Sequence, residues 1–201
     1  MRASMTGLSW YERNGWRPAH LALRVIAVLT LLLSSSMAIA DPCLDKLPPD
    51  LRHLLQVRFP HERLPSNSDT PADAYPAGQS HPDKCLLVAR TDVDGDGRDD
   101  VMLVLPSKSQ RSYRLVAAVH RAQGWRIDTL GSWRLPYQYM YVDVAPPGLY
   151  KHTNDYPYTP GEGDVERFDA KHSGFEFGKI EAEADDYFFD GHRWLYVHSI
   201  D

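Results

Sequence analysis

The stretch that most restricts the fold is residues 92–100, Asp-Val-Asp-Gly-Asp-Gly-Arg-Asp-Asp, with the short apolar runs on either side of it. The run before it is Leu-Leu-Val-Ala (86–89), and the run after it is Val-Met-Leu-Val-Leu (101–105), which Pro106 ends. Short apolar runs bounded by turn residues are typical of strands. The sequence therefore predicts two consecutive strands joined by an acidic loop.

Carboxylates alternate along this loop at relative positions 1, 3, 5 and 9: Asp92, Asp94, Asp96 and Asp100. Calcium is a hard cation that takes roughly six to eight oxygen ligands, and such a loop supplies most of them. Gly97 at position 6 permits the sharp turn, and the carbonyl of Arg98 at position 7 is the expected neutral ligand. The pattern predicts a Ca²⁺ site. The alternative is a polar hairpin turn that needs no metal.

The motif Asp-x-Asp-x-Asp-Gly-x-x-Asp, followed by an apolar strand, resembles the calcium loops of FG-GAP and VCBS-type repeats. The resemblance runs from Asp92 to about Leu105 and implies a calcium loop that connects strand to strand. An EF-hand would carry a bidentate Glu at position 12, where this chain has Leu103. Those families repeat the motif around a propeller, whereas this chain holds one copy.

The beginning of the chain predicts export. Residues 21–33 form an apolar run interrupted only by Arg24 and Thr30, and Ala38-Ile39-Ala40 provides small residues before Asp41. This is the layout of a signal peptide covering residues 1–40. A spanning helix needs about 20 apolar residues, so we expect no membrane span after cleavage and a periplasmic or secreted product.

Two cysteines, Cys43 and Cys85, remain in the expected mature chain. In an oxidising compartment they most simply form a structural disulfide that ties the N-terminal segment to the first strand. The alternative is a redox pair, but the close Cys-x-x-Cys spacing of such pairs is missing.

Charge disfavours nucleic acid as a partner. Without residues 1–40 the chain keeps 18 basic and 26 acidic side chains, a net charge of −8 with neutral histidines. No run of lysine and arginine remains to contact a phosphate backbone.

The expected mature chain has a short N-terminal part followed by many strands. Residues 50–60 predict one amphipathic helix, with Leu47, Leu51, Leu54 and Leu55 on its buried face. Residues 65–84 are rich in Pro, Ser, Asn, Asp and Gly, which is typical of a surface excursion or linker. The predicted strands are 85–91, 100–105, 112–121, 124–130, 137–145, 164–169, 174–184 and 186–198, with a two-residue hairpin turn at Asp190-Gly191.

These elements predict a mainly β fold, an antiparallel meander like a propeller blade with one short N-terminal helix. Segment 41–84 is expected to pack with the β region 85–201 as a single domain. The helix ending at Phe59-Pro60, the loop, the strand 114–121 and the hairpin Tyr-Phe-Phe-Asp-Gly-His-Arg-Trp (187–194) also look like a group of exported bacterial proteins without an assigned activity. That resemblance implies no catalytic residues.

Catalytic patterns are scarce. The histidines form no His-x-His or His-Glu-x-x-His zinc motif, and no serine sits in a Gly-x-Ser-x-Gly elbow. Glu162, Asp164 and Glu166 alternate along a predicted strand and could pair as acid and base in a cleft. Alternating acids on a solvated strand face are the commoner explanation.

The second unusual feature is a concentration of tyrosines before and within a long Pro/Gly-rich loop. The candidate ligand-binding residues are Tyr137, Tyr139, Tyr141, Tyr156 and Tyr158. Tyrosine combines a large apolar body with a polar tip, which suits recognition of a protein or glycan. The alternative is a half-buried sheet face or a small aromatic core.

The sequence thus favours an exported, disulfide-tied β domain that binds Ca²⁺ and acts as a binding module. The expected partner is another exported protein or an envelope component. The competing hypothesis is a hydrolase that acts on cell-envelope glycan or peptide through an acidic cleft.

Overall fold

The computed structural model describes residues 41–74, 85–134, 136–153, 158 and 161–200. The predicted signal peptide (1–40) and Tyr156 lie outside the described residues.

The first sheet is an antiparallel meander in the order β1-β2-β3-β4. Its strands are β1 (Val88–Thr91), β2 (Asp100–Pro106), β3 (Tyr113–Arg121) and β4 (Gly124–Trp133). Every residue of β2 is buried, as its unbroken apolar run requires, because both faces of this central strand are covered. The 92–100 loop therefore joins the edge strand β1 to the most buried strand of the sheet.

The second sheet has the order β10-β9-β8-β5 and is also antiparallel. Its strands are β5 (Met140–Ala145), β8 (Gly174–Lys179), β9 (Glu183–Phe189) and β10 (Trp194–Ile200). A separate hairpin, β6 (Gly148–Lys151) and β7 (Arg167–Ala170), lies in the connection from β5 to β8. The prediction of a mainly β, antiparallel fold is confirmed.

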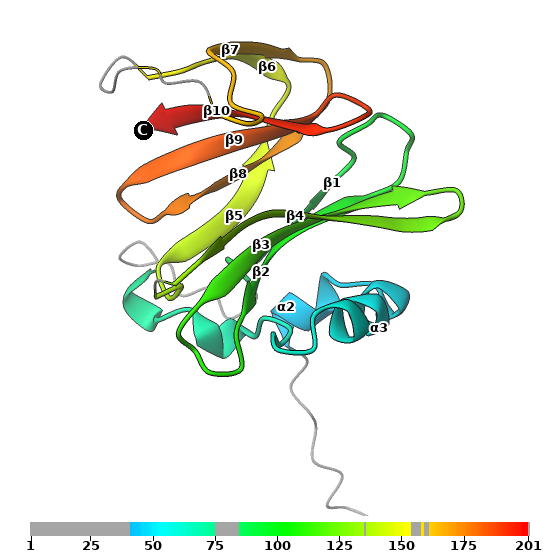
Figure 1. Ribbon diagram of the computed structural model, residues 1–201, viewed down its shortest axis with the longest axis vertical. Coiled ribbons are helices and arrows are strands. Elements are labelled where there is room, and N and C mark those ends of the chain that lie inside the picture. The colour runs from blue at the N-terminus through cyan, green and yellow to red at the C-terminus, as the bar shows by residue number, and fades with distance from the viewer. Residues whose placement is uncertain (1–40, 75–84, 135, 154–157, 159–160, 201) are drawn as a thin grey trace, which may run out of the picture. The chain divides into compact units, whose positions relative to one another are not determined.

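The two sheets meet along β1 and β5, where the amide of Val142 donates to the carbonyl of Leu86 at 2.7 Å. Aromatic rings fill the space between the layers. The Phe177 ring centroid lies 6.3 Å from that of Tyr113 and 5.5 Å from that of Trp133. Figure 1 shows the two layers, with the helices on the side of the first sheet that faces away from the second.

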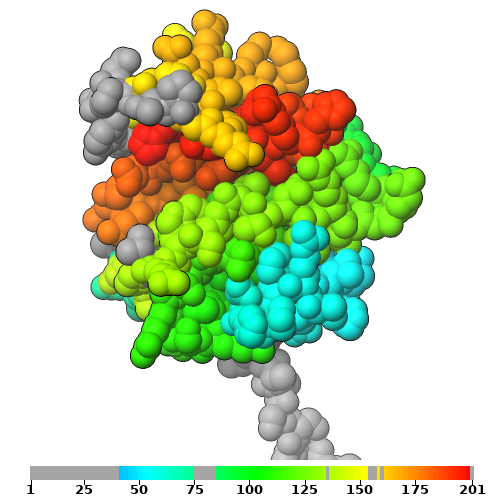
Figure 2. All heavy atoms as spheres, in the orientation of Figure 1, coloured from blue at the N-terminus to red at the C-terminus, as the bar shows by residue number. Residues whose placement is uncertain are grey.

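The N-terminal segment contains α2 (Pro42–Asp45) and α3 (Pro49–Arg58). Leu51 and Leu55 are buried as expected, whereas Leu54 is 41% exposed and lies off the predicted apolar face. Figure 2 shows the atoms of this segment (cyan) packed against those of the first sheet (green). Within the described part of the chain, no helix is long and apolar enough to cross a membrane.

The predicted disulfide is confirmed. Cys43 and Cys85 are bonded to each other, and both are buried. Lys46 reinforces the same junction, because its ammonium group donates to the carbonyls of Cys85 and Val88 at 3.1 and 2.9 Å. The segment that carries the helices is therefore fixed to the start of β1.

The described part of the expected linker, residues 65–74, packs onto the domain through two 3₁₀ turns, Asn67–Asp69 and Ala72–Ala74. Asp69 is buried and forms an ion pair with Arg63, and its Oδ1 accepts a hydrogen bond from the Tyr137 hydroxyl at 3.2 Å. The polar composition of this segment gave no sign of the anchoring, because one partner of Asp69, Tyr137, lies 68 residues further along the chain.

Several predicted strand boundaries are wrong. The strands predicted at 85–91 and 137–145 begin only at Val88 and Met140. The predicted strand 174–184 is two strands, because the chain turns at residues 180–182 with Glu181 at φ +59°. The predicted strand 186–198 is interrupted by a turn. A hairpin at this place is confirmed by the pairing of Phe189 with Trp194, but residues 190–193 connect its strands, and not the two residues Asp190-Gly191 that were predicted. The predicted strand 164–169 begins only at Arg167, and β6 was not predicted.

Candidate metal centre

The acidic loop between β1 and β2 closes on the pair Thr91 and Asp100. Two of its glycines adopt positive φ, +74° at Gly95 and +83° at Gly97, in the region that other residues avoid. These two positions let the chain curl tightly enough for carboxylates far apart in an extended strand to face one another.

Asp92 forms hydrogen bonds with the backbone of the loop. Its carboxylate accepts hydrogen bonds from the amides of Gly95 at 2.7 Å, Gly97 at 2.8 Å and Asp96 at 3.2 Å. Burial acts to raise the pKa of Asp92, but these amides together hold it below its ordinary value. Asp92 is therefore ionised at neutral pH.

Asp100 is fully buried at the other end of the loop. Its two oxygens accept from the amides of Val93 at 2.8 Å and His120 at 2.7 Å, which ties the loop to β3. The pKa of Asp100 is raised to about 6, chiefly by desolvation and also by the charges of Asp94 and Asp92, against the lowering effect of the two amides. The ionised form of Asp100 is therefore poorly compensated.

The side chain of Asp94 is 7% exposed and lies beside β3. Its Oδ2 is within 2.5 Å of the Arg121 guanidinium, yet the contact lacks hydrogen-bond geometry and this buried oxygen accepts no hydrogen bond among the described residues. Arg121 supplies positive charge without a directed donor. The oxygen therefore keeps its capacity to bind a cation.

Asp92, Asp94 and Asp100 each place one carboxylate oxygen within 4.8 Å of the others. Calcium–oxygen bonds are about 2.3–2.6 Å, so two oxygens on one ion are at most about 5 Å apart. The spacing of the three oxygens and their all-carboxylate chemistry therefore suit a hard divalent cation.

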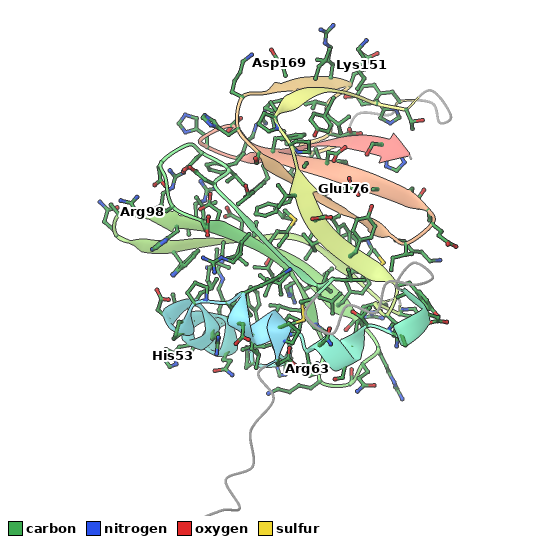
Figure 3. All side chains as sticks on the ribbon, turned by 180° about the vertical axis from the view of Figure 1, so that it is seen from behind. His53, Arg63, Arg98, Lys151, Asp169 and Glu176 are labelled. Atoms are coloured by element: carbon green, nitrogen blue, oxygen red, sulfur yellow. A yellow bond between two sulfur atoms is a disulfide. The ribbon has the colours of Figure 1, made fainter. Side chains whose placement is uncertain are left out.

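Asp96 takes a different position from the one expected of a ligand. Its carboxylate accepts from the Arg98 amide at 2.9 Å and pairs with the Arg98 guanidinium at 2.6 Å. Figure 3 shows Arg98 at the edge of the molecule. The structure thus brings together three of the four predicted carboxylates, and Asp96 lies outside that group.

The tyrosines do not share one surface. Tyr137 is 3% exposed and bonds Asp69 and Arg63 below the surface. Tyr139 is 42% exposed and its hydroxyl lies 3.3 Å from an Asp73 oxygen. Tyr141 pairs with Glu176, and Tyr158 donates to the carbonyl of Asp164 at 3.3 Å.

Among the three acids considered for an active site, Glu162 and Glu166 are exposed. Asp164 has a buried Oδ1 without a hydrogen-bond partner among the described residues, and its backbone bridges to Tyr196 on β10. Nearby, Asp185 accepts from or donates to His198 Nδ1 at 2.7 Å. Burial raises the pKa of Asp185, His198 opposes that shift, and the charges of Asp164 and Glu183 add to it.

Sequence reasoning missed a cavity of about 380 Å³ that adjoins the acidic loop. Its lining comes from separate segments: Val93, Asp94, Phe168, Asp169, Lys171, His172, Ser173, Phe188, Phe189, Asp190 and Gly191. The members of this set are brought together only by the packing of the two sheets and the β6–β7 hairpin. No local pattern could have predicted the cavity.

Searches of protein-family models, curated proteins and solved structures found no match to this chain, so its site is interpreted from its own geometry.

Proposed function

We propose that this protein is an exported Ca²⁺-binding β domain that acts as a binding module. The observation that carries the proposal is that Asp92, Asp94 and Asp100 each place one carboxylate oxygen within 4.8 Å of the others. Among the described residues, Asp94 also has a buried oxygen, Oδ2, without a hydrogen-bond donor. Asp92, Asp94 and Asp100 would hold the ion. A bound Ca²⁺ supplies positive charge that offsets their mutual repulsion.

The role proposed for the ion is structural. Asp100 and Asp94 already link the loop to β3 through His120 and Arg121, so charge neutralisation at this point would hold β1, β2 and β3 together. An ion that binds only the folded chain stabilises it by about 2.7 kcal/mol when its free concentration is a hundred times the dissociation constant.

Export is supported by the apolar run 21–33 and by the disulfide, which persists in oxidising compartments. In that setting the partner is proposed to be another exported protein or an envelope component. The periplasm or the extracellular space is the proposed location.

The test compares two loop variants that lose the same charge. Asp94→Ala removes a member of the cluster, whereas Asp99→Ala removes a carboxylate that is 54% exposed and paired with Arg90. Calorimetric titration should detect Ca²⁺ binding to the wild type and to Asp99→Ala, and little to Asp94→Ala. Wild type should also melt at a higher temperature in Ca²⁺ than in chelator.

Equal melting temperatures in Ca²⁺ and chelator, with no heat of binding at millimolar Ca²⁺, would refute the proposal and leave the loop as an acidic turn. Equal losses in the two variants would mean that overall loop charge, and not the cluster, attracts the ion.

A hydrolase remains the second candidate because Asp185 pairs with His198 close to Asp164. A carboxylate and an imidazole in contact are the usual components of general acid–base catalysis. The purified domain should then degrade cell-envelope glycan or peptide, and Asp185→Asn should abolish that activity without unfolding the protein. Absence of any released fragments would eliminate this candidate.

A further inference from the structure

The cavity beside the acidic loop is bordered by three turns from different parts of the chain. The first wall is Val93 and Asp94, the second is the 171–173 turn between β7 and β8, and the third is the 190–191 turn between β9 and β10. Figure 1 shows the β1–β2 and β9–β10 turns on the same side of the molecule. The volume of the cavity, about 380 Å³, lies in the usual range for ligand pockets, roughly 300–1,000 Å³.

Part of the cavity lining is aromatic. Phe168 stacks on Phe188 with ring centroids 5.1 Å apart and an angle of 17°, and Phe189 follows on the same strand. An apolar group that entered the cavity would therefore displace water from phenylalanine surface, which is favourable.

The carboxylates of the cavity wall already have partners. Asp94 lies against Arg121, and Asp169 pairs with Lys171 at 2.6 Å. Asp190 accepts from the amides of His192 and Arg193, both at 2.8 Å. The acceptors of Asp169 and Asp190 are occupied, and Asp94 belongs to the metal cluster, so the rest of the wall offers little to a cationic organic ligand.

The donors of the second wall are available. Neither the His172 imidazole nor the Ser173 hydroxyl has a hydrogen-bond partner among the residues that the structure describes. A ligand that matches this cavity therefore has an apolar body and a head that accepts hydrogen bonds.

We propose that the cavity binds the C-terminal residue of a peptide whose last side chain is aromatic or branched aliphatic. The side chain would occupy the phenylalanine surface, and the terminal carboxylate would accept from His172 and Ser173. This inference rests on the proposed metal function in one respect: a cation held by Asp92, Asp94 and Asp100 adds attraction for that carboxylate.

The geometry also links the cavity to the loop. The His172 ring lies directly over Gly95, because a Cβ built on that glycine would be 2.3 Å from His172 Cε1. Val93 and Asp94 form the adjoining wall. Ordering of the loop by an ion therefore fixes both walls, and peptide and ion raise each other's affinity by the same factor.

The experiment uses the mature domain and N-acetylphenylalanine, which has an aromatic side chain and a free carboxylate. Chemical-shift titration should place the binding at the cavity residues and give a Kd at least about fivefold lower in Ca²⁺ than in chelator. N-acetylphenylalanine amide, which lacks the charge, should bind more weakly. A simple sugar should not shift these signals.

Variants separate the two walls. His172→Ala should weaken binding of the probe at least about fivefold, and calorimetry on the same variant measures its Ca²⁺ affinity separately. Gly95→Ala and Gly97→Ala both place alanine at positive φ, but only Gly95 lies under His172, since nothing lies within 4 Å of a Cβ at Gly97. Gly95→Ala should therefore weaken probe binding more than Gly97→Ala does.

The outcomes distinguish this inference from the proposed function. No shift at the cavity in Ca²⁺, or equal binding by wild type and His172→Ala, overturns the peptide site even where Ca²⁺ binds. Probe binding that is the same in Ca²⁺ and chelator overturns the linkage. Absence of any Ca²⁺ heat, with His172-dependent probe binding intact, refutes the metal function and supports the peptide site.

Discussion

Two buried aspartates, Asp69 and Asp100, are satisfied in opposite ways. The carboxylate of Asp69 meets the Arg63 guanidinium through two contacts, the Tyr137 hydroxyl and the amide of Ser66. The carboxylate of Asp100 meets only two backbone amides, and its nearest charged neighbours in the cluster are carboxylates.

The charge of Asp69 is therefore balanced within the protein, whereas the charge of Asp100 is not. Arg63 neutralises Asp69 in the folded protein. The stability of the N-terminal segment that this pair anchors should therefore not depend on Ca²⁺. The charge of Asp100 depends on protons or on a cation from outside. Stability tests in Ca²⁺ and in chelator can therefore tell the two regions apart.

The largest effect is expected at the N-terminal segment and independently of Ca²⁺. Replacing Cys43 and Cys85 by serine removes a disulfide between residues 42 positions apart in sequence. On the chain-entropy model, this lowers the free energy of unfolding by up to about 4 kcal/mol. Urea unfolding should give the same loss in Ca²⁺ and in chelator. A loss confined to Ca²⁺ would show that the disulfide supports the loop and not the segment.

Asp69→Ala should cost about 2–4 kcal/mol because it leaves Arg63, Tyr137 and the Ser66 amide without their common acceptor. The side chain of Arg63 is 29% exposed, so water recovers part of the loss. Asp73→Ala, which removes only the contact to exposed Tyr139, is the matched control and should cost less than about 1 kcal/mol. If the stability lost in Asp69→Ala depended on Ca²⁺, the N-terminal segment and the acidic loop would not differ in the way proposed.

In chelator, the loop should become more stable as the pH falls. The pKa of Asp100 is about 6 in the folded protein and 3.8 in the unfolded chain, so the folded state binds the proton more tightly. Its contribution is complete below pH 3.8 and disappears as the pH rises through about 6. From pH 7 to pH 5 wild type should gain on the order of 1 kcal/mol relative to Asp100→Asn.

Calcium should remove that gain, because the ion favours the ionised carboxylate and competes with the proton. Denaturation curves of wild type and Asp100→Asn at the two pH values, with and without Ca²⁺, provide the measurement. A parallel pH response of the two proteins in chelator would show that Asp100 does not titrate in this range.

The smallest effect is expected at Asp96. Because its side chain pairs with Arg98 near the surface, Asp96→Ala should change stability in Ca²⁺ by less than about 1 kcal/mol. Asp94→Ala should lose most of the calcium stabilisation. If the two variants lose equally, Asp96 is a ligand, as the sequence pattern predicted, and the loop rearranges around the ion.

The features that sequence predicted well are local. The loop and β2 follow from the glycine at position 97, alternating aspartates and an apolar run, all within fifteen residues of one another. The Asp190-Gly191 hairpin likewise carries its turn signal in the sequence. The turn at Glu181 has no such signal, because a residue other than glycine takes the positive φ, and the strand was predicted to continue through it.

The features that sequence did not predict depend on distant partners. Tyr137 resembles Tyr139 and Tyr141 in pattern, but its hydroxyl reaches Asp69 in the N-terminal segment, and it is buried. Asp96 resembles Asp94, but only Asp94 faces Arg121 at the end of β3. The cavity combines three turns whose proximity is set by tertiary packing.

The pairing of β5 with β8 has a consequence for the order of folding. Strands β1 to β4 pair with their neighbours along the chain. By contrast, β5 pairs with β8, and residues 146–173, which include the β6–β7 hairpin, separate these two strands in sequence. Closing that excursion costs chain entropy, so we expect the first sheet to form earlier. Pulse-labelled hydrogen exchange would measure the order. Until β5 docks, β1 presents an open edge, and association between partly folded copies is expected to begin there.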